Sequence, residues 1–159
     1  MNYLLDTNHR SYLQRREAMV VSRIQSLPDA ATLYMPVVAQ AELLAGVELA
    51  VSEPRKQELR TLYAQVITMA ADILPITSEV AEQFAHIFAN LRRKGRPMDT
   101  NDIWIAAIAR MHNLVVVTND EHFQYVEGLQ VENWSITSTP SQSEYGSVPM
   151  WSLAQRCSV

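Results

Sequence analysis

Residues 97–120 read PMDTNDIWIAAIARMHNLVVVTND, a helical pattern followed at once by a strand pattern. The first half is apolar after an opening turn that carries Asp99 and Asp102, as in a buried helix whose positive end attracts acidic residues. The second half is a largely β-branched run, Leu114–Val117, which stops shortly before Asp120 as a buried strand does. The stretch therefore predicts a helix leading into a strand, with acids at the start of the helix and after the strand.

The same alternation of strand and helix extends along the rest of the chain. Short apolar runs predict strands at Tyr3–Leu5, Thr32–Met35, Ile73–Ile76, Leu114–Val117 and Leu129–Trp134. Helical patterns predict a helix after Asn8 that ends near Leu27, and further helices at Pro36–Val51, Pro54–Ala71 and Ser78–Arg93. Strands that alternate with helices of this length predict an α/β protein whose parallel sheet is covered by helices on both faces.

The composition fits one folded domain, because 48% of the 159 residues are hydrophobic and 19% are charged. We expect this domain at 1–134, followed by a partly disordered tail at 135–159 that is rich in Ser, Thr and Pro. No apolar run reaches the roughly 20 residues that span a bilayer, and the first residues do not resemble a signal peptide. The single cysteine, Cys157, excludes a disulfide framework and a thiolate metal site, so we expect a cytoplasmic protein.

The basic residues gather beside acidic ones, although the formal net charge of −4 argues against a generally basic nucleic-acid binder. Arg10, Arg15 and Arg16 follow Asp6, and Arg92, Arg93, Lys94 and Arg96 precede Asp99. Two interpretations stay open. These residues are solvated helix ends, which suits a helix terminated by Gly95 and Pro97, or they face the phosphate groups of a substrate.

Asp6 and Asp120 follow two of the predicted strands. In a parallel sheet all carboxyl ends lie at one edge, and ligands bind there where the strand order reverses. Neighbouring strands are about 4.8 Å apart, so two such carboxylates can converge on one ion. We expect Asp102 to join them, because a right-handed crossover starts the next helix at that same edge.

Glu42 is expected on an apolar face of its helix, beside Val38, Ala41, Ala45 and Leu49. An ionised carboxylate in such a place needs a cation or several hydrogen-bond donors, since otherwise it takes up a proton. The alternative that the sequence leaves open is that Glu42 extends to the edge of the helix or pairs with an arginine.

Four carboxylates in one pocket repel each other, and a hard divalent cation such as Mg²⁺ or Mn²⁺ relieves the repulsion through oxygen ligands. The histidines, which are His9, His86, His112 and His122, show no HExxH or similar spacing, and this argues against a zinc site. A carboxylate-bound metal with basic residues nearby suits hydrolysis of a phosphodiester bond. In such a reaction a metal-bound water attacks, and the ion neutralises the charge that grows on the phosphate.

Five motifs, in this order and spacing, resemble the PIN-domain ribonucleases, and most closely the VapC-type toxins of bacterial toxin–antitoxin pairs. They are YLLDTN at 3–8, AELLAG at 41–46, RPMDTNDIWIAAIA at 96–109, VVVTNDEHF at 115–123 and GLQVENW at 128–134. The likeness runs from Met1 to about Trp134. It implies a three-layer α/β/α PIN-like fold with a central, mainly parallel sheet of about five strands.

The resemblance also implies an activity, cleavage of RNA by an Mg²⁺- or Mn²⁺-dependent endoribonuclease, with tRNA and rRNA as candidate substrates. It implies inhibition by a cognate antitoxin protein, and assembly as a homodimer. Position by position, the catalytic and metal-binding acids would be Asp6, Glu42, Asp102 and Asp120. The residues Thr7 and Asn8 would orient Asp6, and Thr118 and Asn119 would support the site.

Asp99 departs from the family pattern, which often has glycine at this position, and it adds an acid near the predicted site. A side chain of this type caps a helix well, because its oxygen accepts from the free amides of the first turn. We therefore expect Asp99 to cap the helix, and Asp102 to turn toward the other acids.

Other classes of Mg²⁺-dependent domain fit the residues poorly. A response-regulator-like phosphoacceptor needs paired acids after the first strand and a lysine after the fifth, whereas no lysine follows Lys94. A haloacid-dehalogenase-like phosphatase needs Asp-x-Asp, where this chain has Asp6-Thr7-Asn8. The alternative that remains open is a non-catalytic PIN-like module that binds RNA or protein.

Overall fold

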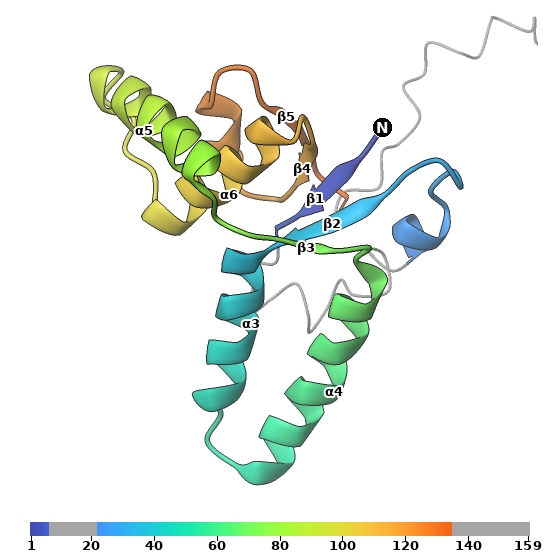
Figure 1. Ribbon diagram of the computed structural model, residues 1–159. Helices are drawn as coiled ribbons and strands as arrows, with labels where there is room; N and C mark the ends of the chain where they lie inside the picture. Colours follow the sequence, from blue (N-terminus) through green and yellow to red (C-terminus); the bar gives the residue numbers. More distant parts are fainter. Residues whose placement is uncertain (7–21, 135–159) are drawn as a thin grey trace, which may run out of the picture.

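The computed structural model describes residues 1–6 and 22–134, which form a five-stranded sheet with helices packed around it (Figure 1). The strands are β1 (Tyr3–Leu5), β2 (Leu33–Pro36), β3 (Ile73–Leu74), β4 (Val115–Val117) and β5 (Gln130–Glu132). Their order across the sheet is β3-β2-β1-β4-β5, and every neighbouring pair is parallel. The predicted α/β class with a parallel sheet is confirmed.

The four longer helices form two pairs in space. These helices are α3 (Val37–Glu48), α4 (Glu53–Met69), α5 (Ser78–Arg93) and α6 (Thr100–Met111), and a short 3-10 helix, η1 (Glu121–Tyr125), follows β4. In Figure 1, α3 and α4 form a hairpin that extends away from the sheet, while α5 and α6 lie together beside β1 and β4. None of the helices in the described ranges is long and apolar enough to cross a bilayer.

Alternate residues of the central strands cover the two faces of the sheet, as the two-residue period of a strand requires. Leu4 and Val116 pack into the core formed with α5 and α6. Tyr3, Leu5 and Val117 pack on the opposite face, against side chains that include Ile24, Leu27, Val66 and Trp134. Both faces are therefore covered, which confirms the three-layer arrangement.

The sequence order of the strands reverses at β1, which lies between β2 and β4. Tyr3 is in register with Leu33 on one side and with Val115 on the other. In parallel sheets, a ligand site forms at the carboxyl edge beside such a reversal. The edge just beyond Leu5 and Val117 is therefore the place where function is expected.

Several element ends differ from the predicted ones. Pro36 is the last residue of β2, not the first of the helix: its backbone is extended (φ −74°, ψ 145°) and it pairs with Leu74. α5 begins and ends at the predicted residues, and its cap is Thr77, whose side chain accepts from the Val80 amide. The difference at Pro36 arises because a cap residue is still extended, so α3 begins one residue later than its first signal.

The other predicted elements shift by a few residues or cannot be compared. α3 ends at Glu48 and α4 at Met69, each before the predicted end, and the 3-10 helix η1 was not predicted. Most of the helix expected before Leu27 lies outside the described residues, as does the tail at 135–159.

Candidate active site

Asp6 and Thr118 meet at the carboxyl edge because each follows one of two adjacent central strands, β1 and β4. The Asp6 amide donates to the Val117 carbonyl at 3.0 Å, which continues the β1–β4 ladder by one residue. The Thr118 hydroxyl donates to Asp6 Oδ2 at 2.7 Å and accepts from the Asp120 amide at 3.1 Å. Both side chains are buried, each with 2% of its surface exposed. This hydroxyl therefore fixes one oxygen of Asp6 and the backbone that carries Asp120.

Asp102 lies in the first turn of α6 and is also buried, with 5% exposed. The pKa of Asp102 is raised from 3.8 to about 7, chiefly by burial and in smaller part by neighbouring carboxylates. In decreasing order of effect, these carboxylates belong to Asp6, Asp120, Asp99 and Glu42. The structure thus brings the four sequence-predicted acids, together with Asp99, into one electrostatic neighbourhood.

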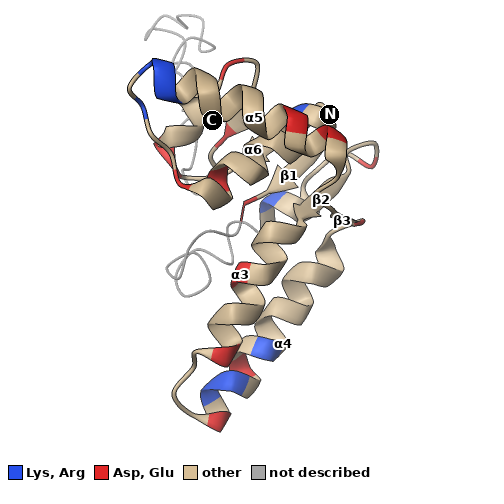
Figure 2. Cartoon of the chain, turned by 60° about the vertical axis from the view of Figure 1, so that its left-hand side comes forward, with Lys and Arg blue, Asp and Glu red and all other residues tan. Residues whose placement is uncertain are grey.

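Asp99 is the N-cap of α6, as predicted. Its side chain accepts from the Asn101 amide at 2.9 Å, so one of the free amides of the first helical turn is satisfied. Figure 2 shows that the loop leaving the blue, basic end of α5 runs to the red, acidic start of α6. The cap thus adds a negative charge beside Asp102 while it also shapes the helix terminus.

Glu42, on α3, is linked to the start of α6 by Asn101, a residue that the sequence analysis did not assign to the site. Glu42 Oε1 accepts from Asn101 Nδ2 at 3.0 Å, which links α3 to the start of α6. The expectation that Glu42 sits on a buried apolar face is wrong: Ala45 and Leu49 are exposed, and the buried face of α3 carries Leu43 and Val47. Glu42 is partly exposed, at the edge of its helix, which was the alternative interpretation.

Asp120 caps the short helix η1. Its Oδ1 accepts from the His122 amide at 2.9 Å and lies 2.7 Å from His122 Nδ1. His122 is a further residue that the sequence did not place at the site, since only zinc-type histidine spacings were considered. The His122 ring is largely exposed to solvent and lies next to the Asp120 carboxylate.

The remaining supporting residues are placed only in part. Thr7 and Asn8 lie outside the described residues, so their predicted role beside Asp6 stays a prediction. Asn119 Oδ1 is buried and, among the described residues, has no hydrogen-bond partner. The predicted supporting role of Asn119 also stays a prediction.

The donor set of this site fits a hard divalent cation. Within residues 1–6 and 22–134, no three His, Cys, Asp or Glu side chains are arranged to hold a metal ion as a set. Mg²⁺, however, is usually held by one or two carboxylates and completes its octahedron with water. Asp6 and Asp102 supply buried oxygens of this kind, and a cation beside them would offset the repulsion that raises the pKa of Asp102.

We expect the Thr118→Val variant to lose about 2 kcal/mol of unfolding free energy, because it removes the buried hydroxyl that donates to Asp6 Oδ2 and accepts from the Asp120 amide. Urea unfolding in the presence of EDTA measures this loss. The matched control is Thr118→Ser, which retains the hydroxyl and should lose less than half as much. Equal losses from valine and serine would show that the hydroxyl does not hold these groups.

Comparison with known proteins agrees with this geometry. The family model described as PIN domain matches residues 3–129. Ribonuclease VapC1 of Haemophilus influenzae (strain R2866) is 30% identical over 137 residues, which cover 85% of this chain and 99% of the relative. The tRNA(fMet)-specific endonuclease VapC of Shigella flexneri is 28% identical over 137 residues, with the same two coverages.

A solved structure gives the same result in three dimensions. It is VapBC-5 from Mycobacterium tuberculosis, described as a member of the VapBC family of toxin-antitoxin systems. The match has a TM-score of 0.62 and 30% identity, and it covers 83% of this chain and 96% of that chain. The fold of this chain thus agrees with that of VapBC-5 over most of both chains. The chain belongs to the PIN-domain family and, within that family, to the VapC ribonucleases.

Proposed function

We propose that this protein is a Mg²⁺- or Mn²⁺-dependent endoribonuclease and the toxin of a toxin–antitoxin pair. The observation that carries the proposal is the buried Asp102, whose pKa is raised by burial and by the carboxylates of the other predicted acids. An arrangement that concentrates negative charge in a buried place is costly without a cation. Such a cost is characteristic of functional sites rather than of structural ones.

Asp6 and Asp102 would hold the metal, with Glu42 and Asp120 reaching it directly or through water. A bound Mg²⁺ supplies a nucleophilic water at neutral pH and neutralises charge on the phosphate during attack. Thr118 keeps one oxygen of Asp6 oriented through its 2.7 Å hydrogen bond. Arg96, which lies between the end of α5 and the acidic start of α6, would bind the RNA backbone.

A metal-removal experiment tests this activity. Protein treated with EDTA should leave total cellular RNA intact, and Mg²⁺ or Mn²⁺ in millimolar amounts should restore cleavage, because the oxygen ligands suit these ions. Sequencing of the new RNA ends then identifies the substrate, with tRNA as the first candidate because the Shigella flexneri relative is named for it. Equal cleavage with and without EDTA would overturn the metal dependence. RNA binding without cleavage at any metal concentration would favour the non-catalytic module.

The proposed antitoxin partner is supported by apolar side chains exposed on the α3–α4 hairpin, namely Leu44, Leu49 and Val51. Apolar residues that cluster on a surface are typical of protein–protein contacts, and they also suit the expected homodimer. We expect expression of the chain alone to arrest bacterial growth. Co-expression of a short neighbouring gene product should restore growth and yield a complex that co-purifies. Growth arrest that no neighbouring gene product relieves would leave the nuclease standing and overturn the toxin–antitoxin assignment.

A further inference from the structure

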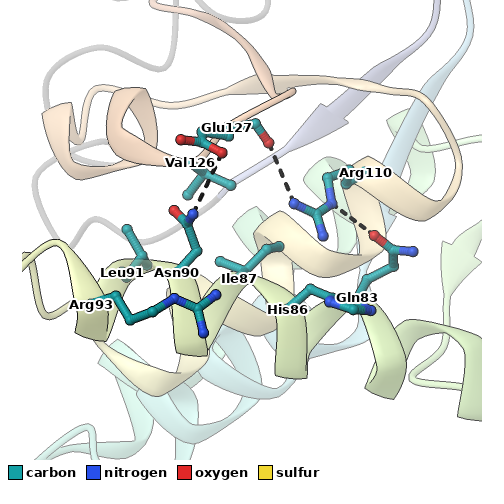
Figure 3. Close-up of a pocket in the computed structure, with 9 residues that line it drawn as sticks. All are labelled: Gln83, His86, Ile87, Asn90, Leu91, Arg93, Arg110, Val126 and Glu127. Carbon is teal, nitrogen blue, oxygen red and sulfur yellow. Dashed lines mark hydrogen bonds between the residues drawn. The ribbon is translucent and has the colours of Figure 1, made fainter.

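A cavity that shares no residue with the acidic edge lies between α5, the last turn of α6 and the segment between η1 and β5 (Figure 3). Its volume is about 310 Å³, at the lower end of the range for small-molecule pockets. The polar side chains around it include Gln83, Asn90, Arg93, Arg110 and Glu127. A cavity of this size and polarity suits one nucleotide unit rather than a protein side chain.

Arg110 is held at the cavity by neutral groups. Its Nε donates to Gln83 Oε1 at 2.7 Å, and one terminal nitrogen donates to the Glu127 carbonyl at 3.4 Å. Neither Arg110 nor Arg93 forms an ion pair with a carboxylate of the described residues. Two guanidinium charges therefore line the cavity, and that of Arg110 is fixed in position. Arg110 also lowers the pKa of Glu127 through its charge, but the carboxylate of Glu127 is ion-paired with Lys94 and not with Arg110. This is the arrangement that binds phosphate, since a guanidinium fork matches its oxygens.

Glu127 is the one acid among the lining residues, and its charge is already compensated. Its carboxylate pairs with the ammonium group of Lys94 and accepts from Asn90 Nδ2 at 3.5 Å. The hydrogen bond from Lys94 lowers the pKa of Glu127, so this carboxyl group stays ionised and paired. Behind the polar groups, buried Ile87 and Val126 give the cavity an apolar side against which a base or ribose can pack.

The cavity lies within reach of an RNA strand bound at the acidic edge. Arg110 follows Asp102 by eight residues on the same helix, which corresponds to about 12 Å along the axis of α6. Because α6 is buried between these two residues, a strand has to pass around it and needs at least three or four nucleotides, at about 3.4 Å each, to cover the distance.

An exposed aromatic ring lies beside the acidic edge on the same element as His122. The guanidinium of Arg96 lies 4.0 Å from the centre of the Tyr125 ring, and the ring of Tyr125 lies 6.5 Å from that of His122. Tyr125 is 40% exposed. Aromatic rings beside cationic side chains are the common platform for single-stranded nucleic acids. They supply contacts for a strand that leaves the site.

We propose that this cavity is a second RNA-binding site, in which Arg93 and Arg110 hold a phosphate of the substrate at least three or four nucleotides from the bond that is cut. The proposal rests on the proposed function, because the strand is the one cleaved at the acidic edge. Its role is affinity and substrate choice, since the cavity does not touch the reacting phosphate.

The test uses the full chain with Arg93→Gln, with Arg110→Gln and with both changes. Arg60→Gln is the matched control, because Arg60 is exposed on α4. Two synthetic RNAs carry the mapped cleavage site, one with two flanking nucleotides on each side and one with eight. With the long RNA we expect each single variant to raise KM about ten-fold with kcat unchanged, as for a contact made equally in ground and transition states. With the short RNA, and for Arg60→Gln, KM should stay at the wild-type value.

Binding gives a second readout that does not depend on cleavage. In the Asp102→Asn background, fluorescence anisotropy with the long RNA should show weaker binding for both arginine variants. The slope of log K against log salt should fall by about 0.7 for each lost phosphate contact. Arg93 is exposed, so its variant tests the proposal even if Arg110→Gln fails to fold.

The outcomes separate the two proposals. A wild-type protein that cuts no RNA overturns the nuclease, whereas anisotropy still decides whether the cavity binds RNA. Unchanged KM, affinity and salt slope in the double variant overturn the second site. The second site is also overturned if the variants bind and cleave RNA like the wild type and change only the binding of inorganic phosphate, or only the co-purification of the antitoxin.

Discussion

Replacement of Asp102 or Asp6 by asparagine is expected to lower RNA cleavage by about 100- to 1,000-fold. The change removes the charge and one carboxylate oxygen from a buried side chain at the carboxyl edge of the sheet, while the size of the side chain is retained. Metal-assisted stabilisation of a phosphoryl transition state supplies several kcal/mol, and each 1.4 kcal/mol corresponds to ten-fold in rate. The initial rate on the mapped RNA, at saturating Mg²⁺, measures the effect.

The matched control for both variants is Asp72→Asn, because Asp72 is exposed and precedes β3, at the opposite edge of the sheet. This variant should cleave at the wild-type rate. A circular dichroism spectrum equal to that of the wild type excludes loss of the fold. Full activity of either Asp6→Asn or Asp102→Asn at saturating Mg²⁺ would remove that residue from the site.

The same Asp102→Asn change is expected to stabilise the metal-free protein at pH 8, by up to roughly 4 kcal/mol. The folded-state pKa of Asp102 is about 7, above its ordinary value of 3.8, so the folded protein keeps a proton that the unfolded chain releases. Stability from this group is therefore complete below about pH 4, is lost as the pH rises toward 7, and stays lost above 7. Asparagine carries no charge, so the variant does not lose folding stability as the pH rises through this range.

Urea unfolding of both proteins in EDTA, at pH 5 and at pH 8, isolates this effect, because other titrating groups contribute equally to both. The advantage of the asparagine variant should be less than half as large at pH 5 as at pH 8, and should grow by about 2 to 3 kcal/mol between these two pH values. Addition of Mg²⁺ at pH 8 should stabilise the wild type and leave the variant nearly unchanged, since ligands stabilise the state that binds them. A constant difference between the two proteins at both pH values would contradict the raised pKa.

Much of the framework of this site follows from local pattern alone. Apolar runs that stop at Asp6 and shortly before Asp120 mark two strand ends, and parallel strands bring such ends to one edge. The capping role of Asp99 also follows from its position, because a helix start needs an acceptor for its free amides. These features depend on neighbours within a few residues, which is the information that a pattern carries.

Most of the features that were missed depend on contacts between distant segments. Glu42 was expected on a buried face, because periodicity defines a stripe on α3 but does not say which side another element covers. The bond from Asn101 to Glu42 joins residues 59 positions apart, and Arg110 meets Gln83 across 27. No local spacing encodes these two pairings. The contact of His122 with Asp120 is local, two positions along the chain, and it was missed because the 3-10 turn after the fourth strand was not predicted.

The 2.7 Å hydrogen bond between Thr118 and Asp6 spans 112 positions of the chain, and it has a consequence for the protein during its synthesis. β1 leaves the ribosome first, yet one of its two neighbours in the sheet, β4, is among the last strands to be made. Domains generally fold as units once their chain has emerged, and non-local strand pairing is slow. A nascent chain therefore carries Asp6 long before the acidic edge exists. A centre built in this way assembles only after translation has passed β4, so we expect chains that end before β4 to lack it.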